Sequence, residues 1–213
     1  MTPDDEKVAT VKQWPRPNTR RQLKSFLGFC GYFRSHIARY TEKALPLINL
    51  ANNCKSNKLA WTATHEAAFD TLKNALISKP VLRAADPNKD FEIFADAANK
   101  NSISAVLIQR EHPDDKVGYA VSYCSRKLEE REKRYPVIEA EILSIVYSLS
   151  RFRWWIYNRK TIIWTDHSPL QYLNSLSKHS SRLARYNLIL QEYNIETRYI
   201  KGTQQLADHL TRL

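Results

Sequence analysis

The hydrophobic periodicity of this 213-residue chain changes near residue 90, and this change most constrains the fold. Before it, apolar residues recur every three or four positions, which is the spacing of one helix face. From "FEIFADA" at residue 91 they alternate, which is typical of a strand. The polar, turn-rich stretch "AADPNKD" separates the two patterns. We therefore predict two domains, residues 1–84 and 85–213.

The first domain is predicted to be small and all-helical. In "NTRRQLKSFLGFCGYFRSHI", Asn18 is the expected N-cap of a helix. "TATHEAAFDTLKNALIS" repeats the pattern, with Thr62 or Thr64 as the cap. The apolar stripe of the first helix consists of Leu23, Phe26, Leu27, Cys30, Phe33 and Ile37.

The second domain is predicted to be of the mixed α/β class. Three strands, 91–97, 102–109 and 117–125, follow one another through short links, which indicates an antiparallel meander. The later elements give the order βββαβαβα, which predicts a five-stranded mixed sheet with flanking helices. They are a helix at 135–157 with Ile138 and Ile142 on its apolar stripe, a strand at 161–166, a helix at 181–193, a strand at 195–200 and a helix at 203–213.

The formal net charge of +11 is unevenly distributed. Residues 1–84 hold 14 Lys and Arg against 6 Asp and Glu, a difference of +8, whereas residues 85–213 hold 19 against 16, a difference of +3. A basic domain suits a polyanion such as nucleic acid, and a solvated basic surface is the other interpretation. No apolar run approaches the ~20 residues of a membrane span, so we expect no membrane association.

Four carboxylates of the second domain occupy positions that core packing does not explain. Each has a simple alternative role, as a turn cap, a solvated helix residue or the partner of a nearby Lys or Arg. Together, however, four clustered acids would repel one another unless cations were bound. Hard oxygen ligands suit Mg²⁺ or Mn²⁺, and two such ions about 4 Å apart support phosphodiester cleavage. The four acids are Asp96, Glu141, Asp166 and Asp208.

Several segments carry a resemblance to a known family. "FADAANKNSISAVLIQ", "YPVIEAEILSIVYSLSRFRWWIYNRK", "TIIWTDHSPLQYL" and "LADHLTRL" resemble the ribonuclease H domain of gypsy-class long-terminal-repeat retrotransposon polymerases. "VKQWPRPNTRRQLKSFLGFCGYFRSHI" and "LAWTATHEAAFDTLKNALISKPVL" resemble the thumb region that precedes it in the same polyproteins. The resemblance implies a ribonuclease H-like fold for residues 85–213 and a thumb-like subdomain for residues 1–84.

The resemblance also implies an activity and a set of catalytic residues. The family cleaves the RNA strand of RNA–DNA hybrids, with two Mg²⁺ (or Mn²⁺) ions held by acids that correspond to Asp96, Glu141, Asp166 and Asp208. Glu139 corresponds to the first acid of the family's helical Glu-x-Glu pair. His167, which follows Asp166, is a possible helper that orients the site or contacts substrate, and a packing role is the alternative.

Basic residues on the predicted helices are candidates for contacts with phosphates. Backbone contacts carry little base information, so we expect weak sequence preference. The candidates are Arg20, Arg21, Lys24 and Arg34 in the first domain, and Arg182 and Arg185 in the second.

Two functions from different classes remain open at this point. The first is the metal-dependent endonuclease, as part of a retrotransposon polyprotein whose polymerase site lies elsewhere, because no "YxDD"-like motif occurs in the chain. The second is a host-captured binding or scaffolding module that keeps the nuclease fold with little or no catalysis. Expected partners are the RNA–DNA hybrid, the rest of the polyprotein and, as a possibility, a second copy in a homodimer. We expect an intracellular location, in the cytoplasm, a retroelement particle or the nucleus.

Overall fold

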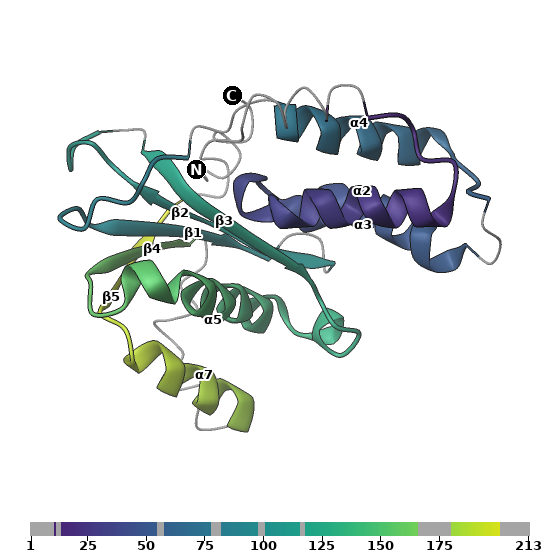
Figure 1. The fold of residues 1–213 in the computed structure, drawn as a ribbon. Coiled ribbons are helices and arrows are strands. Elements are labelled where there is room, and N and C mark those ends of the chain that lie inside the picture. The colour runs from purple at the N-terminus through teal and green to yellow at the C-terminus, as the bar shows by residue number, and fades with distance from the viewer. Residues whose placement is uncertain are drawn as a thin grey trace. The chain divides into compact units, whose positions relative to one another are not determined.

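The computed structural model describes residues 11, 14–54, 58–77, 82–97, 101–115, 118–165 and 180–200. The chain divides into two compact units, Met1–Val81 and Leu82–Leu213, whereas the sequence-based division falls at residue 84. Within the described ranges, no helix is long and apolar enough to cross a membrane. Figure 1 shows the elements of each unit.

The described part of the first unit is helical. It contains α2 (Arg20–Tyr32), a short 3-10 helix η1 (Arg34–His36), α3 (Tyr40–Asn53) and α4 (Ala63–Ile77). Helix α3 packs against both α2 and α4, and the fully buried residues between them include Leu23, Phe26, Leu47 and Leu72.

The N-cap of α2 differs from the sequence-based prediction. Thr19, and not Asn18, occupies this position, and its side-chain oxygen accepts a hydrogen bond from the Gln22 backbone N–H. The Gln22 side chain in turn accepts from the Thr19 N–H, which completes a capping box. The prediction was wrong because it considered the cap residue without its partner three positions later.

The described part of the second unit is a five-stranded mixed sheet with helices on one face (Figure 1). The spatial order is β3-β2-β1-β4-β5, with β1 pairing antiparallel to β2 and parallel to β4. This arrangement confirms the predicted fold class, and the predicted helix at 203–213 lies outside the described residues. The strands are β1 (Phe91–Asp96), β2 (Ser102–Gln109), β3 (Tyr119–Lys127), β4 (Thr161–Thr165) and β5 (Ile195–Tyr199); the helices are η3 (Glu132–Arg134), α5 (Val137–Ile156) and α7 (Ser181–Gln191).

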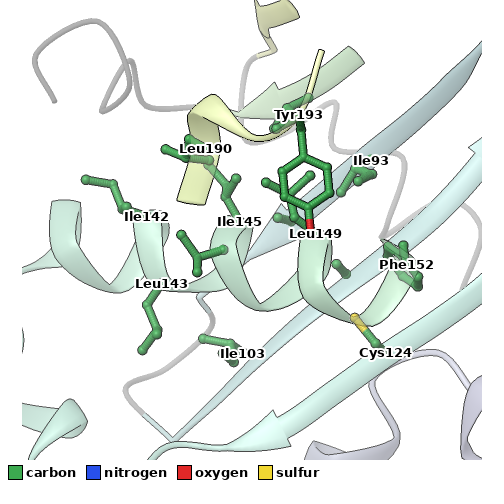
Figure 2. Close-up of a cluster of buried hydrophobic side chains, with 14 of the residues drawn as sticks. Ile93, Ile103, Cys124, Ile142, Leu143, Ile145, Leu149, Phe152, Leu190 and Tyr193 are labelled. Atoms are coloured by element: carbon green, nitrogen blue, oxygen red, sulfur yellow. The ribbon is translucent and has the colours of Figure 1, made fainter. Parts of the chain in front are cut away.

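The core of this unit lies between α5 and the sheet. Ile142, Ile145 and Leu149 of α5 cluster with Ile93 and Ile103 of the strands, and α7 adds side chains such as Leu190 (Figure 2). The predicted apolar stripe of α5 is wrong at one end, because Ile138 is 43% exposed. The first turn of α5 therefore projects beyond the packed core.

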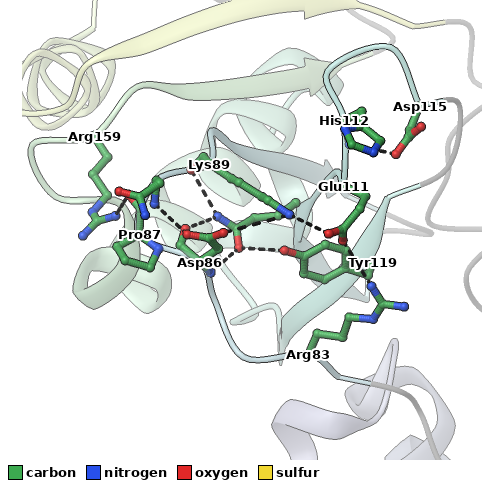
Figure 3. Close-up of polar contacts among 11 residues, drawn as sticks. Arg83, Asp86, Pro87, Lys89, Glu111, His112, Asp115, Tyr119 and Arg159 are labelled. Carbon is green, nitrogen blue, oxygen red and sulfur yellow. Dashed lines mark hydrogen bonds and ion pairs between the residues drawn. The ribbon is translucent and has the colours of Figure 1, made fainter.

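The segment that leads into β1 is fastened to the sheet by Gln109, which is fully buried at the end of β2. Its Nε2 donates to the backbone oxygens of Asp86 (2.8 Å) and Lys89 (3.1 Å), and its Oε1 accepts from the Asp86 N–H (2.8 Å). Ion pairs from Glu111 to Lys89 and Arg83 surround these bonds (Figure 3).

Gly118 lies against the same structure, just before β3. A Cβ at this position would come within 2.7 Å of the Ile108 Cδ1 and 2.8 Å of the Gln109 backbone oxygen. Since the second contact is with backbone, it cannot be relieved by a side-chain rotation. Gly118 is therefore required by close packing.

We expect Gly118→Ala to lower the free energy of unfolding by about 1–3 kcal/mol, because the new methyl group overpacks this site. Gly31→Ala in α2 is the control, since its Cβ would meet only the Tyr40 hydroxyl at an ordinary 3.6 Å. That variant should be stabilised by about 0.5–1 kcal/mol through helix propensity. Urea titrations followed by circular dichroism measure both changes, and equal stability of the two variants would contradict the assignment.

Candidate active site

Two of the four predicted acids lie in the described residues, on neighbouring elements. Asp96 is the last residue of β1, half-buried, and pairs in register with Ser104 of β2. Glu141 lies in α5 and is only 7% exposed. Because α5 packs on β1, the packing brings the strand of Asp96 and the helix of Glu141 together.

Asp166, His167 and Asp208 lie outside the described residues. Strand β4, which ends at Thr165, runs parallel to β1, with Trp164 paired to Phe94. Parallel neighbours end at the same edge of a sheet, so β4 ends beside the end of β1. Among the residues that the structure describes, no group of three or more His, Cys, Asp or Glu could hold a metal ion.

The donor atoms of the two described acids fit a hard divalent cation. Carboxylate oxygens are ligands of Mg²⁺ and Mn²⁺, and a site assembled from them does not suit Zn²⁺. Glu139, the neighbouring acid of α5, has a different environment, since it forms an ion pair with Arg182 of α7. The two acids of α5 therefore differ in surroundings, although they are only two residues apart.

The predicted phosphate contacts differ in exposure. Arg21, Lys24 and Arg34 are exposed, and Arg20 is half-buried. In α7, Arg185 is exposed, whereas Arg182 is half-buried against Glu139. Two aromatic side chains near the end of α5 also differ in exposure, since Phe152 is buried and Trp154 is 95% exposed.

Sequence reasoning missed a buried ion pair four residues before Asp96. The Glu92 carboxylate of β1 accepts from Nε (2.5 Å) and Nη2 (2.9 Å) of Arg110 and from Nε1 of Trp164 (2.6 Å). The hydrogen bond to Glu92 raises the pKa of Arg110 further above its ordinary value, although burial opposes it. These bonds link β1, the end of β2 and β4. The sequence did contain a signal for this ion pair: Glu92 lies among the alternating residues of one strand, and Arg110 directly follows the next strand.

An open recess of about 660 Å³ adjoins this ion pair, lined in part by Glu92, Arg110, Trp164 and Arg198. Its lining carries both signs of charge, and it includes neither Asp96 nor Glu141.

A second ion pair holds the turn that precedes α5. Glu132 in η3 is buried, and its carboxylate accepts from Arg126 of β3 at 2.6 Å and 2.9 Å and from the Glu129 N–H at 2.8 Å. Burial opposes the charged form, but the hydrogen bonds from Arg126 and the backbone outweigh it and lower the pKa of Glu132. The bonds anchor the turn that precedes the helix of Glu141.

Comparison with known proteins identifies the class to which this arrangement belongs. Residues 86–193, about half of the chain, match the family model described as the RNase H-like domain found in reverse transcriptase. The chain therefore belongs to the RNase H-like domain family of reverse transcriptases. This finding agrees with the ribonuclease H resemblance of the sequence.

Particular relatives are parts of transposon polyproteins. The whole chain is 33% identical over 217 residues to the retrovirus-related Pol polyprotein from transposon 297 of Drosophila melanogaster, and 36% identical over 220 residues to the transposon Tf2-3 polyprotein of Schizosaccharomyces pombe. It spans only 19% and 16% of their lengths.

Solved structures show the same fold at low identity. The foamy viral protease-reverse transcriptase in complex with an RNA/DNA hybrid matches 93% of this chain, and 27% of its own, with a TM-score of 0.77 and 17% identity. The same enzyme in complex with double-stranded DNA gives a TM-score of 0.76 and 16% identity, over 93% of this chain and 42% of its own.

We expect Glu132→Gln to lower the free energy of unfolding by about 1–3 kcal/mol near pH 7, because a charge-assisted pair is lost. The folded-state pKa of Glu132 lies below its ordinary 4.5. Its ionised form therefore stabilises the fold above the ordinary pKa, and this stabilisation is lost as the pH falls through the folded-state pKa. Urea titrations should show the difference between wild type and variant disappearing at low pH. A difference that persists under acid conditions would contradict the role of the charge.

Proposed function

We propose that this chain is a divalent-metal-dependent endonuclease that cleaves the RNA strand of RNA–DNA hybrids. Within a gypsy-class retrotransposon polyprotein, residues 1–84 would be the thumb region and residues 85–213 the nuclease. The observation that carries the proposal is an RNase H-like domain with Asp96 at the end of β1 and a buried Glu141 on the helix that packs against it.

The proposed metal ligands are the carboxylates of Asp96, Glu141, Asp166 and Asp208, which would hold two Mg²⁺ or Mn²⁺ ions. Such ions supply an activated water and a Lewis acid for phosphodiester hydrolysis. Glu141 is only 7% exposed, and carboxylate oxygens are the ligands that Mg²⁺ and Mn²⁺ prefer.

Chain connectivity supports Asp166 as a member of this set. It follows Trp164 by two residues in the sequence. Trp164 is itself paired with Phe94, two residues before Asp96. His167 follows Asp166 and is proposed to orient the site or to contact substrate.

Recognition of the substrate is proposed to rest on the sugar and on groove shape. The 2′-OH distinguishes the RNA strand from DNA, and a hybrid differs from duplex DNA in groove geometry. The candidate phosphate contacts of the second unit lie on α7. Arg185 is exposed, and Arg182 is half-buried.

The exposed face of α2 supports a thumb role for the first unit. Arg21, Lys24, Gly28 and Tyr32 follow one another at steps of three and four residues, so they share one face. Tyr32, which sequence reasoning missed, is 78% exposed. A Cβ at Gly28 would meet no described atom within 4 Å, so the glycine leaves space for a nucleic-acid backbone. Arg20 at the start of α2 and Arg34 in η1 are further candidates.

The alternative function is a binding or scaffolding module that keeps this fold without catalysis. Ala95 and Ala98 stand beside Asp96 where the family that the sequence resembles usually has Thr and Ser, and this departure motivates the alternative. A homodimer and an intracellular location also remain proposals.

We expect the wild-type chain to cleave the RNA strand of a labelled hybrid in Mg²⁺ or Mn²⁺. Loss of a residue that only hydrogen-bonds to a metal ligand lowers activity by roughly 10–100-fold. Asp96→Asn and Asp166→Asn should each lower cleavage by more than this, because each removes a proposed metal ligand. Hybrid binding in EDTA should persist in both. Asp114→Asn, at an exposed aspartate of the same unit, is the matched control.

Undiminished cleavage by Asp166→Asn would refute the assignment of this acid. A folded wild-type chain that binds hybrid but cleaves in neither metal would favour the binding module.

We expect Gly28→Ala to weaken binding of an RNA–DNA hybrid while stabilising the protein. A steric cost of about 1.4 kcal/mol against the bound backbone corresponds to a roughly tenfold higher Kd. The free energy of unfolding should rise by about 0.5–1 kcal/mol, because alanine favours the helix. Ser25→Ala on the same helix, also exposed, is the control for a change of side chain without added bulk. Unchanged hybrid affinity in Gly28→Ala would show that α2 does not approach the duplex at this residue.

A further inference from the structure

Arg182, in the first turn of α7, makes two contacts with the beginning of α5. Its Nη2 donates to the Oε2 of Glu139, and its guanidinium carbon lies 3.9 Å from the centre of the Tyr135 ring. Glu139 is in the first turn of α5, and Tyr135 directly precedes the N-cap residue, Pro136. These contacts, which we call the Arg182 bridge, therefore hold both sides of the N-cap of α5.

The first turn of α5 has few other attachments among the described residues. Pro136 makes no side-chain capping bond, and Val137 and Ile138 are 56% and 43% exposed. Continuous burial begins only at Glu141. Because this turn has no side-chain cap and Val137 and Ile138 are exposed, the Arg182 bridge attaches it to α7, beside the packing of the Tyr135 ring on the core.

The environment of Arg182 does not suit a phosphate contact. The Glu139 side chain is only 16% exposed, so loss of its partner would leave a largely buried carboxylate. Burial opposes the charged guanidinium, yet the hydrogen bond that Arg182 donates to Glu139 outweighs it and raises the pKa of Arg182. A phosphate could engage Arg182 only in competition with this carboxylate. Arg185, three residues further along α7, is exposed instead.

We infer that Arg182 is a positioning residue for Glu141. Through Glu139 and Tyr135 it orients the first two turns of α5, and hence the carboxylate that is proposed to bind metal. The inference rests on the proposed function and replaces the sequence-based prediction that Arg182 contacts nucleic acid.

The test compares Arg182→Gln with Arg185→Gln in the full chain. Arg182→Gln should raise the Mg²⁺ concentration for half-maximal cleavage by about 10–100-fold, as loss of an outer-sphere partner does. Its Kd for hybrid in EDTA should stay within about twofold of wild type. Arg185→Gln should show the opposite pattern. Its Kd for hybrid should rise, and the slope of hybrid affinity against salt concentration should fall by about one released counterion. The Mg²⁺ concentration for half-maximal cleavage should stay unchanged.

A double-mutant cycle and amide hydrogen exchange provide readouts that do not depend on cleavage. The free energy of unfolding should fall no further in the double variant Arg182→Gln/Glu139→Gln than in Arg182→Gln alone, because both changes remove the same ion pair. Exchange at residues 139–141 should be faster in Arg182→Gln than in wild type, and unchanged in Arg185→Gln. If Arg182→Gln does not fold, Tyr135→Leu removes the stacking surface while the ion pair remains, and the same directions are expected.

The outcomes separate this inference from the proposed function. If wild type does not cleave, the proposed function fails, and accelerated exchange at 139–141 would still establish the attachment of α5. A higher hybrid Kd with unchanged Mg²⁺ dependence in Arg182→Gln would identify a phosphate contact and overturn the inference. Lower stability with unchanged exchange at 139–141 and unchanged Mg²⁺ dependence would overturn it as well.

Discussion

The burial of one face of α5 against the sheet is the interaction on which the second unit depends. Ile142, Ile145, Leu149 and Phe152 are all at most 1% exposed, and they contact the strands and α7 in one continuous core. This packing determines which end of α5 lies beside which strand. It therefore also determines that the helix carrying Glu141 lies against the strand that ends in Asp96.

Buried charges connect the elements around this core in pairs. Glu92 with Arg110 links β1 to the residue after β2, Glu132 with Arg126 links β3 to the turn before α5, and Glu139 with Arg182 links α5 to α7. A buried carboxylate is tolerated when a positive partner and further hydrogen bonds compensate it. Each of these acids has such a partner within the chain.

The sequence predicted the order and type of the described elements of the second unit because periodicity is a local property. The bounds of β2 agree with the prediction at both ends, and β4 begins at the predicted residue. Errors arose where tertiary packing overrides the local pattern. Ile138 continues the apolar stripe of α5 yet is 43% exposed, and continuous burial along the helix begins only at Glu141. The sequence also gave no separate bounds for α3, which contains Pro46 and follows Arg39 in a left-handed conformation.

The sequence by itself determined the family, the fold class and the identity of the four candidate acids, since these depend on residue type and order along the chain. Only the tertiary structure decided the environment of each charged side chain. From the sequence, Arg182 and Arg185 are equivalent basic residues of one helix, and both were predicted to contact phosphates. In the structure, Arg182 is paired with Glu139 and Arg185 is exposed. The difference arises from residue 139, which lies more than forty positions earlier in the chain. Contacts over that separation are set by packing, which local sequence does not encode.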